Sequence, residues 1–405
     1  MSRRAASLIG LIKQRDRRVV GVVGALVVVV VALVVVLTSS ASTKSGDSNG
    51  SAIVSPVASQ TVPAAKPHRP RLIHSARRAN SLSLAKMVGQ MIMPGMAGTS
   101  PSRHLLAEVR RGEIGGIILY SYNIGPGLRS ALAALQRAAR AGRNPPLLVS
   151  VDQEGGPIRR FPGAPPTIGP REMSSAALAF QQGGASGNYL AARGVNLDLA
   201  PVSDVAGTSG FEVAQDRGFA GGPQRVARMA SAFSRGLQSA RVAATAKHFP
   251  GVGALTTDTD FKLASIDSSL AELRHGALVP FQSAIGAGVD LVMVANAIYP
   301  ALDRSRAPGG FSYRIVTQLL KGQLHFRGVV ITDALDSPAA LGGTFGSRAV
   351  RAARAGADIT LFAPDDAGVP AYSALLQAAR SGVLTRSRIQ DAYERVLALK
   401  RQVAK

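Results

Sequence analysis

The stretch Gly328-Val329-Val330-Ile331-Thr332-Asp333-Ala334-Leu335 is the clearest guide to the fold of this chain. Its first half is a run of apolar and β-branched residues without polar alternation, which is typical of a strand that is buried on both faces. Such strands belong to parallel sheets that are covered by helices. The run ends at an acid, Asp333, so we expect an α/β fold with a carboxylate at the end of a buried strand.

Similar runs recur from about residue 83 onward, separated by longer amphipathic stretches. The other strands that we predict are Gly116–Tyr120, Leu147–Val151, Val195–Ala200, Val242–Ala246, Leu291–Ala295 and Ile359–Phe362, with Met87–Met93 as a weaker one. The helices expected between them include Pro223–Ala240, Ser269–Gly286 and Thr385–Gln402. This alternation favours a single (β/α)8 barrel of the TIM type. A doubly wound open sheet is the alternative, but no Gly-x-Gly-x-x-Gly fingerprint follows the first strand.

Polar residues stand where these runs end. In a barrel, the carboxyl ends of the strands surround the catalytic mouth. A single acid after a strand is usually a helix cap or a turn residue, whereas several strands that end in this way indicate a site. The residues at these positions are Asp152, Asp204, Lys247, His248, Asn296 and Asp333.

The N-terminal part of the chain has a different composition. Residues 1–18 carry six basic residues and one acid, and no charged residue occurs from Val19 to Thr43. A span needs about 20 apolar residues, and basic residues before it keep the N-terminus inside. We therefore expect a cytoplasmic basic segment 1–18, a single-pass transmembrane anchor 19–38, a flexible linker 39–82 and an extracytoplasmic domain 83–405. A cleaved signal peptide and a secreted domain are the alternative, although the apolar region of a signal peptide is usually about 7–15 residues.

Composition excludes several classes of function. The sequence has 405 residues and no cysteine, which rules out disulfides, thiolate metal sites and cysteine nucleophiles. The formal net charge is +23, but the arginines are scattered, and we expect no nucleic-acid partner. The basic surface suits anionic envelope polymers or lipid headgroups. The histidines are dispersed without paired spacing, so we expect no metal site.

Four segments, taken together, resemble the N-terminal barrel of glycoside hydrolase family 3, in its β-N-acetylhexosaminidase branch. They are Val151–Gly156 with Arg160-Phe161 behind it, Gly194–Val205, Ala246–Gly251 and Gly328–Leu335. The resemblance covers about residues 83–402. It implies hydrolysis of O-glycosidic bonds in an N-acetylhexosaminide-containing glycan or peptidoglycan fragment of the envelope or the extracellular space. It also implies a covalent glycosyl-aspartate, retention of configuration and no cofactor.

The resemblance assigns roles to individual residues. Asp333 matches the nucleophile of the family. Lys247 and His248 match a pair that donates hydrogen bonds to sugar hydroxyls, and Asp152 matches an acid that accepts them. Arg217 matches a substrate-binding arginine, and we place Arg160 with the same group.

The loop Val252–Asp260 departs from the family pattern. Asp258 keeps the acid of the catalytic dyad, but Asp260 stands where the acid/base histidine is expected. Val252, Pro157 and Asn296 also replace family residues. Three hypotheses follow: Asp260 is the acid/base, Glu154 serves instead, or the protein binds glycans without turnover. Since the sequence ends at Lys405, we expect no second domain to supply the acid.

Overall fold

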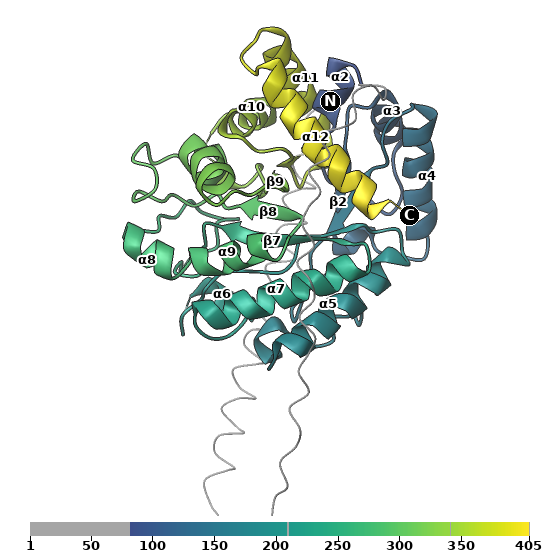
Figure 1. The fold of residues 1–405 in the computed structure, drawn as a ribbon. Helices are drawn as coiled ribbons and strands as arrows, with labels where there is room; N and C mark the ends of the chain where they lie inside the picture. The colour runs from purple at the N-terminus through teal and green to yellow at the C-terminus, as the bar shows by residue number, and fades with distance from the viewer. Residues whose placement is uncertain (1–81, 209, 341, 405) are drawn as a thin grey trace, which may run out of the picture. The chain divides into compact units, whose positions relative to one another are not determined.

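The computed structural model describes residues 82–208, 210–340 and 342–404. Within them, parallel strands form a curled sheet and helices pack around its outside (Figure 1). The parallel strands are β1 (Ile92–Met93), β2 (Gly116–Leu119), β3 (Leu148–Val151), β6 (Leu197–Asp198), β7 (Ala243–Phe249), β8 (Leu291–Val294), β9 (Val329–Thr332) and β10 (Thr360–Leu361).

Backbone hydrogen bonds connect each strand to the next and the last strand to the first. Strands β2, β3, β6, β7, β8 and β9 pair in this order, and β10 pairs with β1. The N–H of Gly115, before β2, donates to the carbonyl of Ile92 at 3.0 Å. The N–H of Thr332 in β9 donates to the carbonyl of Ile359, before β10, at 3.1 Å. The strands therefore follow one another in a closed ring, which is consistent with the predicted (β/α)8 barrel.

The helices come mostly between strands in the sequence, whereas the first precedes β1 and the last two follow β10. They are α2 (Leu84–Gly89), α3 (Arg103–Arg111), α4 (Leu128–Ala141), α5 (Ala176–Ala191), α6 (Phe211–Ala214), α7 (Pro223–Ser239), α8 (Leu270–His275), α9 (Leu278–Gly286), η4 (Arg314–Gln323), α10 (Phe345–Ala355), α11 (Gly368–Arg380) and α12 (Arg386–Val403). Several begin at a hydroxyl side chain that accepts a backbone N–H of the first turn, as Ser102, Ser175 and Thr385 do.

Helix α12 covers one end of the barrel, at the amino ends of the strands (Figure 1). Its Val396 and Leu399 pack against the apolar residues that the strands direct inward. Lys400 donates to the carbonyl of Gly115 just before β2, and Arg395 donates to the carbonyl of Gly328 just before β9. Because this end is filled, the opposite end, where the strands finish, is left for a site.

The strand predictions are confirmed in position but not in every boundary. Each of the seven strong apolar runs contains a strand. The predicted strand Met87–Met93 was wrong for most of its length, because Ser83 caps helix α2 and only Ile92–Met93 are extended. The predicted helix Ser269–Gly286 is two helices, since Gly276 interrupts it. Strand β7 continues past Ala246, so Lys247 and His248 lie inside the strand and do not follow it.

The predicted basic segment, the anchor and nearly all of the linker lie outside the described residues. Among residues 82–208, 210–340 and 342–404, no helix is both long and apolar enough to cross a membrane.

Candidate active site

A cavity of about 290 Å³ opens at the carboxyl ends of the strands. The eight residues to which the family resemblance gives a site role all line it, although they come from segments up to 181 positions apart (152 to 333). They are Asp152, Arg160, Arg217, Lys247, His248, Asp258, Asp260 and Asp333. The fold therefore brings the predicted set together, and the role of each residue has to be argued from its contacts.

Lys247 lies between two carboxylates at the floor of the cavity. Its Nζ is 2.7 Å from Oδ1 of Asp152 and 2.7 Å from Oε1 of Glu154. Burial alone would lower the pKa of Lys247, but the two carboxylates raise it, so the ammonium stays charged. Glu154 is placed by the short antiparallel hairpin of β4 (Gln153–Gly155) and β5 (Ile158–Arg159).

Glu154 is also bound by Arg217. Nε and Nη2 of Arg217 donate to its two oxygens at 2.9 and 2.8 Å, a bidentate arrangement that favours charged partners. Burial would raise the pKa of Glu154, but Arg217 and Lys247 hold it well below its usual range. Glu154 is therefore an ionised structural partner and has no proton to give at neutral pH. This geometry disfavours Glu154 as the acid/base.

Asp152 is held ionised in the same way. It accepts Nζ of Lys247 and, at 3.1 Å, Nη2 of Arg160. Burial would raise the pKa of Asp152, whereas Lys247 and Arg160 lower it. The guanidinium of Arg160 also lies 5.7 Å from the ring centre of Tyr120, which lines the cavity. The result is a fixed row of donors and acceptors that suits the hydroxyls of a sugar.

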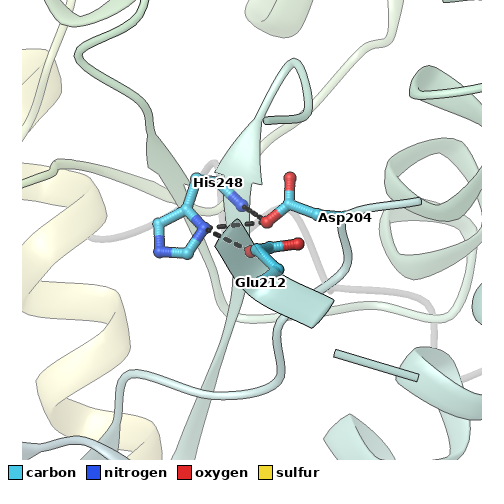
Figure 2. Close-up of side chains that lie close together, drawn as sticks. All are labelled: Asp204, Glu212 and His248. Atoms are coloured by element: carbon cyan, nitrogen blue, oxygen red, sulfur yellow. Dashed lines mark hydrogen bonds and ion pairs between the residues drawn. The ribbon is translucent and has the colours of Figure 1, made fainter. Parts of the chain in front are cut away.

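Asp204 and Glu212 lie beside the ring of His248, and Asp204 orients it (Figure 2). Its Nδ1 lies 2.8 Å from Oδ2 of Asp204, and Glu212 lies next to both, with Oε1 3.8 Å from Nδ1. Glu212 is 1% exposed. Burial and the neighbouring Asp204 carboxylate raise the pKa of Glu212 well above its usual value. Its surroundings therefore favour the protonated form of Glu212 beside the ionised Asp204.

Asp204, Glu212 and His248 are also the one group in the described part of the chain with potential metal-ligand atoms close enough together, within 4.8 Å. A cation there would have to replace the hydrogen bond between Nδ1 and Asp204 and the proton on Glu212. The described residues therefore show a hydrogen-bonded cluster whose ligand atoms could be used by a cation only after these protons are released. The predicted absence of a metal site stays a prediction.

The three acids Asp258, Asp260 and Asp333 line the same cavity. Asp333 follows β9, and its Oδ1 accepts the N–H of Ala334 at 2.8 Å. Oδ1 of Asp258 accepts the N–H of Asp260 at 2.9 Å. Loss of water around its carboxyl, together with the charges of Asp333 and Asp258, raises the pKa of Asp260 to about 7, although the residue as a whole is exposed.

Asn296, also predicted from its place after a strand, does not line the cavity. Its Nδ2 donates to the carbonyl of Ala334 at 2.9 Å, so it holds the segment that follows Asp333. Sequence reasoning missed Glu212 and Phe261. It also missed Tyr120, although Tyr120 ends a predicted strand and the strand-end rule could have found it. Nothing in the sequence pattern marks Glu212 or Phe261.

Comparison with known proteins gives consistent matches. Residues 83–399 match the family described as Glycosyl hydrolase family 3 N terminal domain. An uncharacterized secreted glycosyl hydrolase of Arthroderma benhamiae is 33% identical over 342 residues, which are 81% of this chain and 96% of that protein. A β-hexosaminidase of Xanthomonas oryzae pv. oryzae is 38% identical over 285 residues, which are 67% of this chain and 83% of that protein.

Solved structures agree with these matches. A glycoside hydrolase family 3 β-N-acetylglucosaminidase of a Paenibacillus species superimposes with a TM-score of 0.76 at 34% identity, covering 80% of this chain and 63% of that one. This chain thus spans less than two thirds of that protein. A β-N-acetylhexosaminidase of Beutenbergia cavernae superimposes with a TM-score of 0.71 at 31% identity, covering 79% of this chain and 99% of that one.

Proposed function

The chain belongs to glycosyl hydrolase family 3, and we propose that it is a retaining exo-β-N-acetylhexosaminidase with Asp333 as nucleophile and Asp260 as acid/base. One observation carries this proposal. The carboxyl of Asp260 lines the same cavity as Asp333, and its pKa is raised to about 7. A group with such a pKa can both give and take a proton near neutral pH, which is what general acid–base catalysis needs. Asp260 thereby replaces the histidine that the family pattern places there.

The reaction proceeds in two displacements at the anomeric carbon. In the first, an Asp333 oxygen bonds to that carbon, the bond to the leaving-group oxygen breaks, and this oxygen takes the proton of Asp260. In the second, the ionised Asp260 takes a proton from water, whose oxygen bonds to the anomeric carbon and releases Asp333. Two inversions restore the β configuration.

The residues around Lys247 bind the sugar in this mechanism. The charged Lys247 and Arg160 donate to sugar hydroxyls, and Asp152 and His248 complete the set. Arg217 acts through Glu154, because two of its nitrogens are committed to that carboxylate. The charges of these residues are paired with one another, so a neutral sugar can bind without leaving a buried charge uncompensated.

The size of the cavity supports cleavage at a chain end. Its volume of about 290 Å³ lies at the small end of ligand pockets, which are roughly 300–1,000 Å³. Such a cavity suits one terminal sugar unit. The name of the Paenibacillus relative, a β-N-acetylglucosaminidase, favours N-acetylglucosamine as that unit.

We also propose that the domain acts outside the cytoplasm, on envelope or extracellular glycans, behind an anchor at residues 19–38. The uncharged run from Val19 to Thr43 and the basic residues before it motivate this. Fractionation of cells that express the full chain would test it. The protein should stay with the membrane in high salt, and a protease added outside should digest residues 83–405. Recovery from the soluble cytoplasmic fraction would contradict the proposal.

The acid/base assignment is tested with substrates of different leaving groups. Asp260→Ala should slow hydrolysis of 4-methylumbelliferyl N-acetyl-β-glucosaminide by roughly 10²–10⁴-fold. Cleavage of the 2,4-dinitrophenyl glycoside, whose leaving group needs no proton, should be rescued by azide, which replaces water as the attacking group and forms the β-glycosyl azide. Asp267→Ala is the matched control, since Asp267 is an exposed acid outside the cavity.

The second candidate is a glycan-binding protein without turnover, which the replaced histidine at position 260 favours. It predicts binding of N-acetylglucosamine without hydrolysis of any aryl glycoside, the dinitrophenyl compound included. Asp260→His separates the two. If this variant hydrolyses substrates that the wild type does not, the wild type has lost its turnover. If it lowers an existing activity, Asp260 is the working acid.

A further inference from the structure

Phe261 is a large apolar side chain that faces water at the cavity. It is 77% exposed, more than any other large hydrophobic residue in the described segments, and it also lines the cavity. Exposure of apolar area costs roughly 25 cal/mol per Å² relative to burial. A ligand that covers the ring would therefore gain binding free energy from it.

The loop that carries Phe261 is held in place by bonds to two other segments. Ser337 Oγ, from the region after β9, donates to the carbonyl of Thr259 at 2.6 Å. Gln215 Nε2 donates to Oδ2 of Asp258 at 3.2 Å, and the N–H of Phe261 donates back to the carbonyl of Asp258 at 3.2 Å. The backbone on which the ring stands is therefore fixed beside the acids.

The position of Asp260, the residue before Phe261, indicates which part of the substrate the Phe261 ring contacts. Asp260 has to lie beside the oxygen of the leaving group in order to protonate it. Phe261 comes directly after Asp260 and lines the same cavity, so a leaving group that reaches the carboxyl of Asp260 comes within reach of its exposed ring. The cavity of about 290 Å³ suits the terminal sugar alone, so the next unit must lie outside it, at the rim.

We propose that Phe261 forms a leaving-group subsite, on which the apolar C–H face of a second pyranose ring stacks. This inference rests on the proposed function, because Asp260 fixes where the leaving group lies. It also narrows the substrate class: the protein prefers an N-acetylhexosaminide joined to another sugar ring over one joined to a small or linear alcohol. Tyr or Trp at this position would keep the platform.

The experiment compares two substrates that differ only in the leaving group. They are N,N′-diacetylchitobiose, which leaves a pyranose, and N-acetyl-β-glucosaminyl fluoride, which leaves a single atom. Phe261→Ala should lower kcat/KM for the disaccharide roughly tenfold and change that for the fluoride less than twofold. Phe261→Trp should restore the disaccharide rate. Phe180→Ala is the matched control, because Phe180 is an aromatic residue of α5 that is 44% exposed and does not line the cavity.

Equal losses on both substrates, or no loss on either, would overturn the subsite. Failure of the proposed function is a different result: the wild type would hydrolyse neither substrate. In that case, binding measured by calorimetry in an Asp333→Ala background tests whether Phe261 forms the subsite. The subsite stands if Phe261→Ala weakens the binding of the disaccharide but not of N-acetylglucosamine, and it falls if both bind as before.

Discussion

The Nδ1 atom of His248 lies 2.8 Å from Oδ2 of Asp204, a residue 44 positions earlier in the chain. The same carboxylate also accepts the backbone N–H of His248 at 3.0 Å and that of Val252 at 2.7 Å. Because Asp204 is an acceptor for all three donors, Nδ1 carries a proton and Nε2 is left for a sugar hydroxyl. Asp204 thus fixes both the ring and the start of the loop that leads to Asp260.

Asp204→Asn should therefore impair catalysis, although Asp204 itself does not line the cavity that binds the sugar. A hydrogen bond to a charged group contributes about 1.5–3 kcal/mol, so we expect kcat/KM to fall roughly 10- to 100-fold. Asp303→Asn is the control, because Asp303 is a buried acid, bonded to Ser312, outside the cavity. The unfolding midpoints of both variants are measured as well. If the loss of activity follows the decrease in unfolding midpoint equally in both variants, Asp204 contributes to stability alone.

The raised pKa of Asp260 predicts the pH profile of the enzyme. With a pKa of about 7, its proton is lost as the pH rises, and kcat/KM for a substrate with a poor leaving group should fall about tenfold per unit well above pH 7. The 2,4-dinitrophenyl glycoside needs no proton in the first step and should lack this decline. Steady-state rates from pH 5 to 9 measure both profiles. An identical alkaline decline for the two substrates would assign it to another group.

The limits of the sequence prediction follow from what each residue contacts. Asp333, Lys247 and Asp152 stand at or near strand ends, so the barrel geometry alone predicts that they meet. Glu212 could not be found in this way, because it lies in the short helix α6 and meets His248 only through the fold. The extension of β7 through His248 was not predicted either, because polar residues in a strand interrupt the apolar run on which the prediction depends.

The neutral state of Glu212 predicts a pH dependence of stability. Its folded pKa is raised, so the stability that it contributes is present below the unfolded value of about 4.5 and is lost as the pH rises toward the folded value. Glu212→Gln keeps the shape of the neutral acid and has no proton to lose. The variant should gain stability relative to the wild type as the pH rises above about 4.5, as measured by denaturant unfolding over a pH series. A constant difference across that range would show that Glu212 is ionised in the fold.

Lys400 predicts the opposite trend at the closed end of the barrel. Its Nζ donates to Oε1 of Gln90 at 2.5 Å and to the carbonyl of Gly115 at 2.7 Å, and both partners are neutral. Burial lowers the pKa of Lys400 to about 7 from an ordinary value of 10.5. Between these values the unfolded chain binds a proton that the folded protein has released, so stability rises with pH, by at most about 1.4 kcal/mol per unit.

Lys400→Met removes this group while keeping most of its apolar stem. The free energy of unfolding of the wild type, measured in guanidinium chloride from pH 6.5 to 9.5, should therefore rise relative to that of the variant as the pH increases. Lys86→Met is the control, because Lys86 also donates to a carbonyl, that of Gly142, but is only half-buried. Its curve should stay parallel to that of the wild type. If the curve of Lys400→Met is parallel as well, Lys400 keeps its charge inside the fold, and its two acceptors balance the loss of water.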